Sequence, residues 1–87
     1  MLLSQTSSAS VFEVIVRVAT EVLPQLQGRA VQPTDRLEDL GANSLDRADI
    51  VVMALQELGL AIPLTEVFGP RNVGELAELL HAKRQLA

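Results

Sequence analysis

Proline and glycine residues divide this chain into three stretches long enough for a helix, and this division limits the fold more than any other feature. The breaks lie at Pro24, at Gly59 followed by Pro63, and at the Gly69-Pro70 pair. Proline cannot continue a helix, and glycine commonly ends one. No apolar run approaches the ~20 residues needed to span a bilayer. We therefore expect short helices that pack on one another.

Composition favours one all-helical domain. The chain has 87 residues, of which 48% are hydrophobic, with two Phe and neither Trp nor Tyr, so its core must consist of aliphatic side chains rich in helix formers. The net charge of -4 repels nucleic acids and anionic membranes, and we expect neither as a partner. The absence of Cys excludes disulfides and thiolate metal sites, and it indicates a reducing cytoplasm.

The first stretch has apolar residues at helical spacing. This pattern predicts a helix over residues 10–23, opened by Ser10 and Glu13 at capping-box spacing. Residues 1–9 lack both the basic region and the long apolar run of a signal peptide. We expect these residues to form a flexible tail, and residues 10–87 to form the folded domain.

The second stretch predicts a helix from Ser44 to about Leu58, with Asn43 as its cap, Asp46 in its first turn and Gly59 as its stop. Its apolar residues form two stripes. One comprises Ile50, Val51, Ala54 and Leu58, and the other comprises Leu45, Ala48 and Val52. A small core has no obvious use for both stripes.

The remaining segments predict a long loop and two further helical pieces. Residues 24–41 show no sustained periodicity, although Leu37 and Leu40 can anchor them to the core, and a loop of this length is often functional. Residues 64–68 leave room for one short helical turn, and Asn72 caps a last helix. The predicted fold is a small bundle of three main helices and one short helix.

A serine follows a glycine-containing turn at the start of the second helix, in the segment Gly41-Ala42-Asn43-Ser44-Leu45-Asp46. The chain here resembles the acyl carrier protein family, whose hallmark is a Gly-x-Asp-Ser-Leu segment at this place. The resemblance covers nearly the whole chain and implies the four-helix acyl carrier fold. It also implies that Ser44 bears a covalent 4'-phosphopantetheine arm, and that the chemistry belongs to partner enzymes.

Ser44 has two other interpretations besides the attachment site. Serine is common in the first turn of a helix and often has no special role there. A serine hydrolase would need a base, but the segment lacks the Gly-x-Ser-x-Gly elbow, and the one histidine, His81, lies on a different predicted helix. We expect His81 to face solvent, and we favour the attachment site because its context matches the family.

The stripe of Leu45, Ala48 and Val52 also has two interpretations, since small bundles often wrap apolar residues more than halfway round a helix. Carrier proteins, however, use their second helix as a docking surface, where apolar anchors lie within a charged rim. We therefore predict a partner-binding surface made of Leu45, Asp46, Arg47, Ala48, Asp49 and Val52.

Two departures from the common family pattern point to a subgroup. Asn43 stands where Asp usually precedes the serine, and Arg47 is a cation on a surface that is typically acidic. The segment from Gly41 to Asp49 resembles free-standing donor carriers of polyketide β-branching cassettes. Such a donor supplies acetyl to a hydroxymethylglutaryl (HMG) synthase-like enzyme. Acceptor carriers bear a Trp on the second helix, and this chain has none.

The resemblance implies a non-enzymatic, monomeric carrier in polyketide biosynthesis. Its implied partners are a phosphopantetheinyl transferase, an acyltransferase, the HMG synthase-like enzyme and a decarboxylating ketosynthase. Two alternatives stay open at the level of sequence: a general polyketide or fatty-acid carrier, and a helical structural subunit that never receives the arm.

Overall fold

The apolar spacing of the first stretch produces helix α1 (Ser8–Val22) in a computed structural model that describes residues 8–86. The helix begins two residues before the predicted start, so Ser10 lies inside it and the prediction of Ser10 as its cap was wrong. Its buried face includes Val11, Ile15 and Val18. The predicted tail over residues 1–9 falls mostly outside the described residues, apart from Ser8 and Ala9, which are helical.

The second and last helices begin as their caps predict. Helix α2 (Ser44–Leu58) has the predicted bounds and ends at Gly59, whose φ of 68° lies in the left-handed region. Helix α3 (Val73–Leu86) follows Asn72, whose Oδ1 accepts a hydrogen bond of 2.8 Å from the Glu75 N–H. The predicted short helix is the 3-10 turn η4 (Leu64–Val67). Residues 8–86 contain no β-strand.

The long connection between α1 and α2 is more ordered than the sequence pattern predicts. It contains two 3-10 turns, η2 (Pro24–Leu26) and η3 (Leu37–Leu40). Leu26, Leu37 and Leu40 are buried in the core, which confirms the anchoring role expected of Leu37 and Leu40. Burial of these leucines offsets the entropy of ordering the loop.

The start of α3 fastens this loop to the helices. The N–H of Val73 donates to the Asp35 carbonyl at 2.9 Å, and the N–H of Gly74 donates to the Pro33 carbonyl at 2.8 Å. The backbones approach so closely that a Cβ at Gly74 would lie 2.9 Å from the Cβ of Pro33. These bonds satisfy two amides that a helix start otherwise leaves unpaired.

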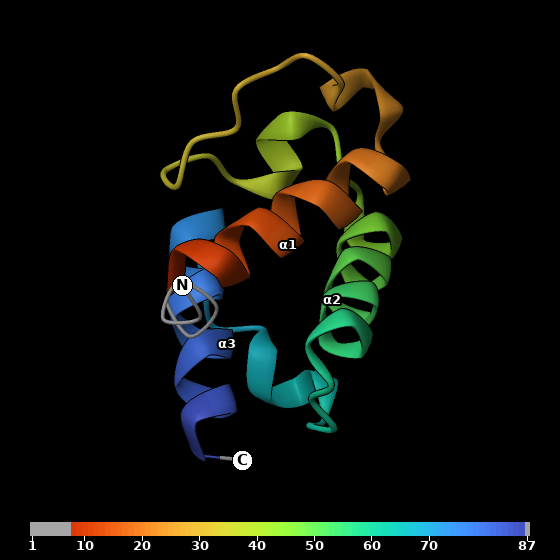
Figure 1. Cartoon of the computed structure of the whole chain (residues 1–87). Coiled ribbons are helices and arrows are strands. Elements are labelled where there is room, and N and C mark those ends of the chain that lie inside the picture. Colours follow the sequence, from red (N-terminus) through yellow and green to blue (C-terminus); the bar gives the residue numbers. More distant parts are fainter. Residues whose placement is uncertain (1–7, 87) are drawn as a thin grey trace.

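Helix α1 packs against both α2 and α3, and η4 also contacts both (Figure 1). The core between these elements is aliphatic, and Ile15, Ile50 and Leu80 are fully buried in it. No helix within residues 8–86 has the length and apolar character required to cross a membrane. The arrangement confirms the predicted all-α bundle and sets the start of α2 beside η3 and the segment that enters α3.

Candidate functional site

Ser44 is the first residue of α2, and its side chain is exposed. The turn before it favours glycine, because Gly41 has a φ of 106°, a backbone conformation that other residues rarely adopt. Ala42 then points into the core, where it is 5% exposed. The glycine turn and the buried alanine thus fix the chain direction that leaves the Ser44 hydroxyl open to solvent.

Asn43 closes the start of α2 with a pair of reciprocal hydrogen bonds. Its Oδ1 accepts from the Asp46 N–H at 2.7 Å, and Oδ2 of Asp46 accepts from the Asn43 N–H at 3.2 Å. Asparagine therefore provides the full capping box without the charge of an aspartate. Within the part of the chain that the structure describes, the N–H groups of Ser44 and Leu45 donate no hydrogen bond and remain available to an anion beside Ser44.

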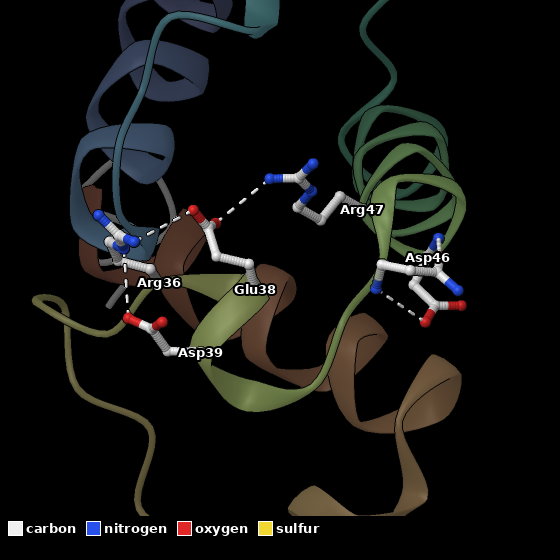
Figure 2. A network of polar contacts seen from close by, with 6 residues as sticks. Arg36, Glu38, Asp39, Asp46 and Arg47 are labelled. Atoms are coloured by element: carbon white, nitrogen blue, oxygen red, sulfur yellow. Dashed lines mark hydrogen bonds and ion pairs between the residues drawn. The ribbon is translucent and has the colours of Figure 1, made fainter.

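The side chain of Arg47 on α2 forms an ion pair with Glu38 on η3. Figure 2 shows Arg47 and Glu38 extending toward each other from these two elements, with 3.3 Å between Nη1 of Arg47 and Oε1 of Glu38. Glu38 also pairs with Arg36, whose Nη2 lies 3.5 Å from its Oε2. Asp46 lies on the other side of the start of α2 (Figure 2). The half-buried Arg47 is thus tied to the loop, a contact that the sequence pattern did not indicate.

The pKa of the Glu38 carboxyl lies below its ordinary value. The main cause is hydrogen bonding by its own backbone N–H. Slight desolvation acts in the opposite direction, and the positive charges of Arg36 and Arg47 lower the pKa further. Glu38 therefore stays ionised, and able to pair with Arg47, to a lower pH than an ordinary glutamate.

A cleft of about 390 Å³ opens beside Ser44 between α2, η3 and the segment that enters α3. Its floor is apolar, with Val51, Val67 and Leu76. Its charged side chains are Glu38, Arg47 and Arg71, and Phe68 lines it while remaining 63% exposed. The cleft can accept a flexible group that carries both an anion and an apolar part.

The second apolar stripe of α2 stays largely on the surface. Leu45 is 69% exposed and Val52 is 37% exposed, whereas Ala48 is half-buried. Asp46 is half-buried and Asp49 is exposed on the same helix. The alternative that Leu45 and Val52 belong to the core is therefore wrong. The other stripe faces inward, with Ile50, Val51 and Ala54 buried and Leu58 half-buried.

Sequence reasoning missed three residues at this site and misplaced one residue elsewhere. The cleft is also lined by Glu38, Phe68 and Arg71. Of these, only Phe68 stands out in the sequence, as an aromatic residue directly before the Gly69-Pro70 break. His81 is half-buried instead of facing solvent, and its buried Nδ1 has no hydrogen-bond partner among the described residues. It lines neither the cleft nor the start of α2.

Comparisons with known proteins agree with this geometry. A family model described as a phosphopantetheine attachment site matches residues 13–80. The chain is 49% identical over 77 residues to the polyketide biosynthesis acyl-carrier-protein AcpK of Bacillus subtilis, covering 88% of this chain and 94% of that protein. It is 44% identical over 39 residues to the mitochondrial acyl carrier protein of Dictyostelium discoideum, covering 45% of this chain and 32% of that protein.

A solved structure resembles the fold closely. It is the crystal structure of the curacin biosynthetic pathway HMG synthase in complex with acetyl donor-ACP. One chain of that structure superimposes with a TM-score of 0.85 and 39% sequence identity, covering 87% of this chain and 97% of that one. The likeness therefore extends over most of the chain.

Proposed function

The chain belongs to the acyl carrier protein family, whose members bear 4'-phosphopantetheine and are carriers rather than catalysts, and from that premise we propose that Ser44 is the point of attachment. The arm joins a serine oxygen through a phosphodiester, and its terminal thiol holds an acyl group as a thioester. The role of the protein itself is to hold the arm, to present its cargo and to dock on the enzymes that use it.

The exposed hydroxyl of Ser44 at the start of α2 is the observation that carries this assignment. The site fits the group, because two unused backbone N–H groups and the positive end of the helix dipole favour a phosphate at this position. Arg47 adds a positive charge one helical turn away. No group of three or more His, Asp or Glu side chains suited to a metal ion occurs within residues 8–86.

The cargo we assign is acetyl, and the acceptor we assign is an HMG synthase-like enzyme of polyketide β-branching. Support comes from the likeness to AcpK and to the small chain solved with an HMG synthase. The docking surface on α2 is formed by Leu45, Asp46, Arg47, Ala48, Asp49 and Val52. The exposure of Leu45 and Val52 leaves two apolar anchors available to a partner.

Other partners follow from the same role. A phosphopantetheinyl transferase installs the arm, and an acyltransferase with a decarboxylating ketosynthase supplies the acetyl group. We propose that the protein works as a monomer in the cytoplasm, a compartment that suits a chain without Cys.

Intact-mass measurement of Ser44→Ala tests the assignment. The parent, incubated with coenzyme A and a phosphopantetheinyl transferase, should gain the mass of one arm. The variant should gain none while its circular dichroism stays unchanged, because the substitution removes one exposed oxygen and little packing. An arm on the variant would refute the assignment.

A second experiment tests the donor role. The acetyl-loaded protein should transfer its acetyl group to a β-branching HMG synthase faster than a generic fatty-acid carrier does. Equal rates for the two carriers would instead favour a general acyl carrier. Failure of the parent to accept any arm would favour an unmodified structural subunit.

A further inference from the structure

The cleft beside Ser44 is locally basic, although the protein as a whole has a net charge of -4. Two arginines, Arg47 and Arg71, line it together with one acid, Glu38. The charge of Glu38 is shared with Arg36, which lies within ion-pair distance outside the cleft lining. The positive charges of the cleft therefore exceed its negative charges, and they do so next to Ser44.

Arg47 is within reach of any group attached to the Ser44 oxygen. The two residues are three positions apart on α2, a spacing that places their Cβ atoms about 5–6 Å from each other on one face of a helix. Both side chains line the same cleft. A phosphate on Ser44 would therefore lie within the span of the Arg47 side chain.

Both guanidinium groups have donors to spare. Arg47 contacts Glu38 through Nη1 alone, and a guanidinium carries five N–H donors. If Arg47 turned toward the phosphate, Glu38 would keep its pair with Arg36 and would not be left alone. Within residues 8–86, no ion pair engages the Arg71 side chain.

Apart from Glu38, the carboxylates near the proposed site lie outside the cleft lining, including that of Glu75, which accepts a hydrogen bond from the Arg71 N–H. Asp46 lies on the other side of the start of α2 from Arg47 (Figure 2), and its carboxylate accepts a hydrogen bond from the Asn43 N–H. Asp49 does not line the cleft. The basic side of Ser44 is thus the side that faces the cleft.

We propose that Arg47 and Arg71 form an anion-binding site for the phosphodiester that joins the arm to Ser44. This inference rests on the proposed function, because it assumes that Ser44 bears the arm. The two arginines come from α2 and from the segment that enters α3, so a shared phosphate links the two sides of the cleft. The arm then stabilises the fold that carries it, since the contact exists only in the folded state.

Urea unfolding of matched forms with and without the arm tests the inference. The form with the arm should unfold at a higher urea concentration, and this gain should fall by roughly half in Arg47→Gln and in Arg71→Gln, as for two similar charge-assisted contacts. Arg29→Gln is the matched control, because Arg29 is exposed and lies outside the cleft lining. The gain should persist in that variant and should shrink with added salt in the parent.

Intact mass confirms the arm on every sample, so failure of attachment in the parent counts against the proposed function and not against this site. An equal gain in Arg47→Gln, Arg71→Gln and Arg29→Gln would overturn the site, as would a parent without any gain.

A second measurement needs no variant. The arginine side-chain NMR signals of Arg47 and Arg71 should shift when the arm is attached, and that of Arg29 should not. Unchanged signals at Arg47 and Arg71 would also overturn it.

Discussion

Asn43 gives the start of α2 the same capping geometry as the Asp that is common in the family at this position, but without the negative charge beside Ser44. Its side chain accepts from the Asp46 N–H at 2.7 Å, as an aspartate in that position would do. The difference between the two residues is therefore electrostatic. With an arm on Ser44, as proposed, a neutral cap would leave its phosphate with one anion fewer beside it than an aspartate would, which agrees with the basic cleft on its other side.

Replacement of Asn43 separates these two contributions. Asn43→Ala should destabilise the protein by about 1 kcal/mol, because the Asp46 N–H loses its acceptor, whereas Asn43→Asp should stay close to the parent. Urea unfolding of the unmodified proteins measures both changes. Equal losses in the two variants would mean that the cap contributes through the amide group of Asn43 and not through its acceptor oxygen.

At the scale of the element, α2 uses two faces for different purposes. One face presents Ile50 and Ala54 to the core, with neither exposed at all. The other leaves Leu45 and Val52 in contact with water. A helix that were only a core element would have no reason to keep both faces apolar, and the exposed one is therefore the part of α2 most suited to a partner.

Truncation of aliphatic side chains should reveal this division. Ile50→Ala and Leu80→Ala should each cost about 2–5 kcal/mol, because both remove fully buried methyl groups, whereas Val52→Ala should cost much less. Chemical denaturation compares the three variants. A loss at Val52 as large as that at Ile50 would show that the outer face also supports the fold.

Local patterns predicted most of the helices. The bounds of α2 follow from Asn43 and Gly59, since both its cap and its stop act on neighbouring residues. The start of α1 was wrong because Ser10 had capping-box spacing but the helix continues past it to Ser8. The turns η2 and η3 were not predicted, because burial of Leu26, Leu37 and Leu40 by distant helices stabilises them and no local periodicity does.

At the scale of the whole molecule, the cleft draws on three separate segments. Ser44 and its turn were predictable because the motif is contiguous in the chain. The ion pair between Glu38 and Arg47 was not, because it depends on how the loop is fastened to α3 through Asp35 and Pro33. The sequence pattern therefore predicted the place of Ser44 at the start of α2, and the fold supplies the surroundings in which the proposed arm would rest.

Arg47 also lies on the surface predicted to meet the partner enzyme. Arg47→Glu should slow acetyl transfer to a β-branching HMG synthase on the order of tenfold at low salt, because it reverses a charge that the partner is expected to complement. The defect should shrink as salt screens it. Acyl-transfer rates measure this change, with Arg29→Glu as the control for net charge.

Leu45→Ala distinguishes this docking role from the phosphate site. It should slow the same transfer while keeping the gain in stability that the arm confers, since Leu45 does not line the cleft. If Arg47→Glu transferred acetyl as fast as the parent at low salt, Arg47 would not be part of the docking surface.

The two backbone hydrogen bonds at the start of α3 also make opening of the long loop measurable by hydrogen exchange. The N–H groups of Val73 and Gly74 point at the carbonyls of Asp35 and Pro33, so neither amide can exchange its proton with water until the loop lifts away. Their exchange rates therefore report how often the loop and the start of α3 separate. The bonds at Pro33 and Asp35 lie directly before η3, so each separation would also loosen the attachment of the cleft wall that contains Glu38.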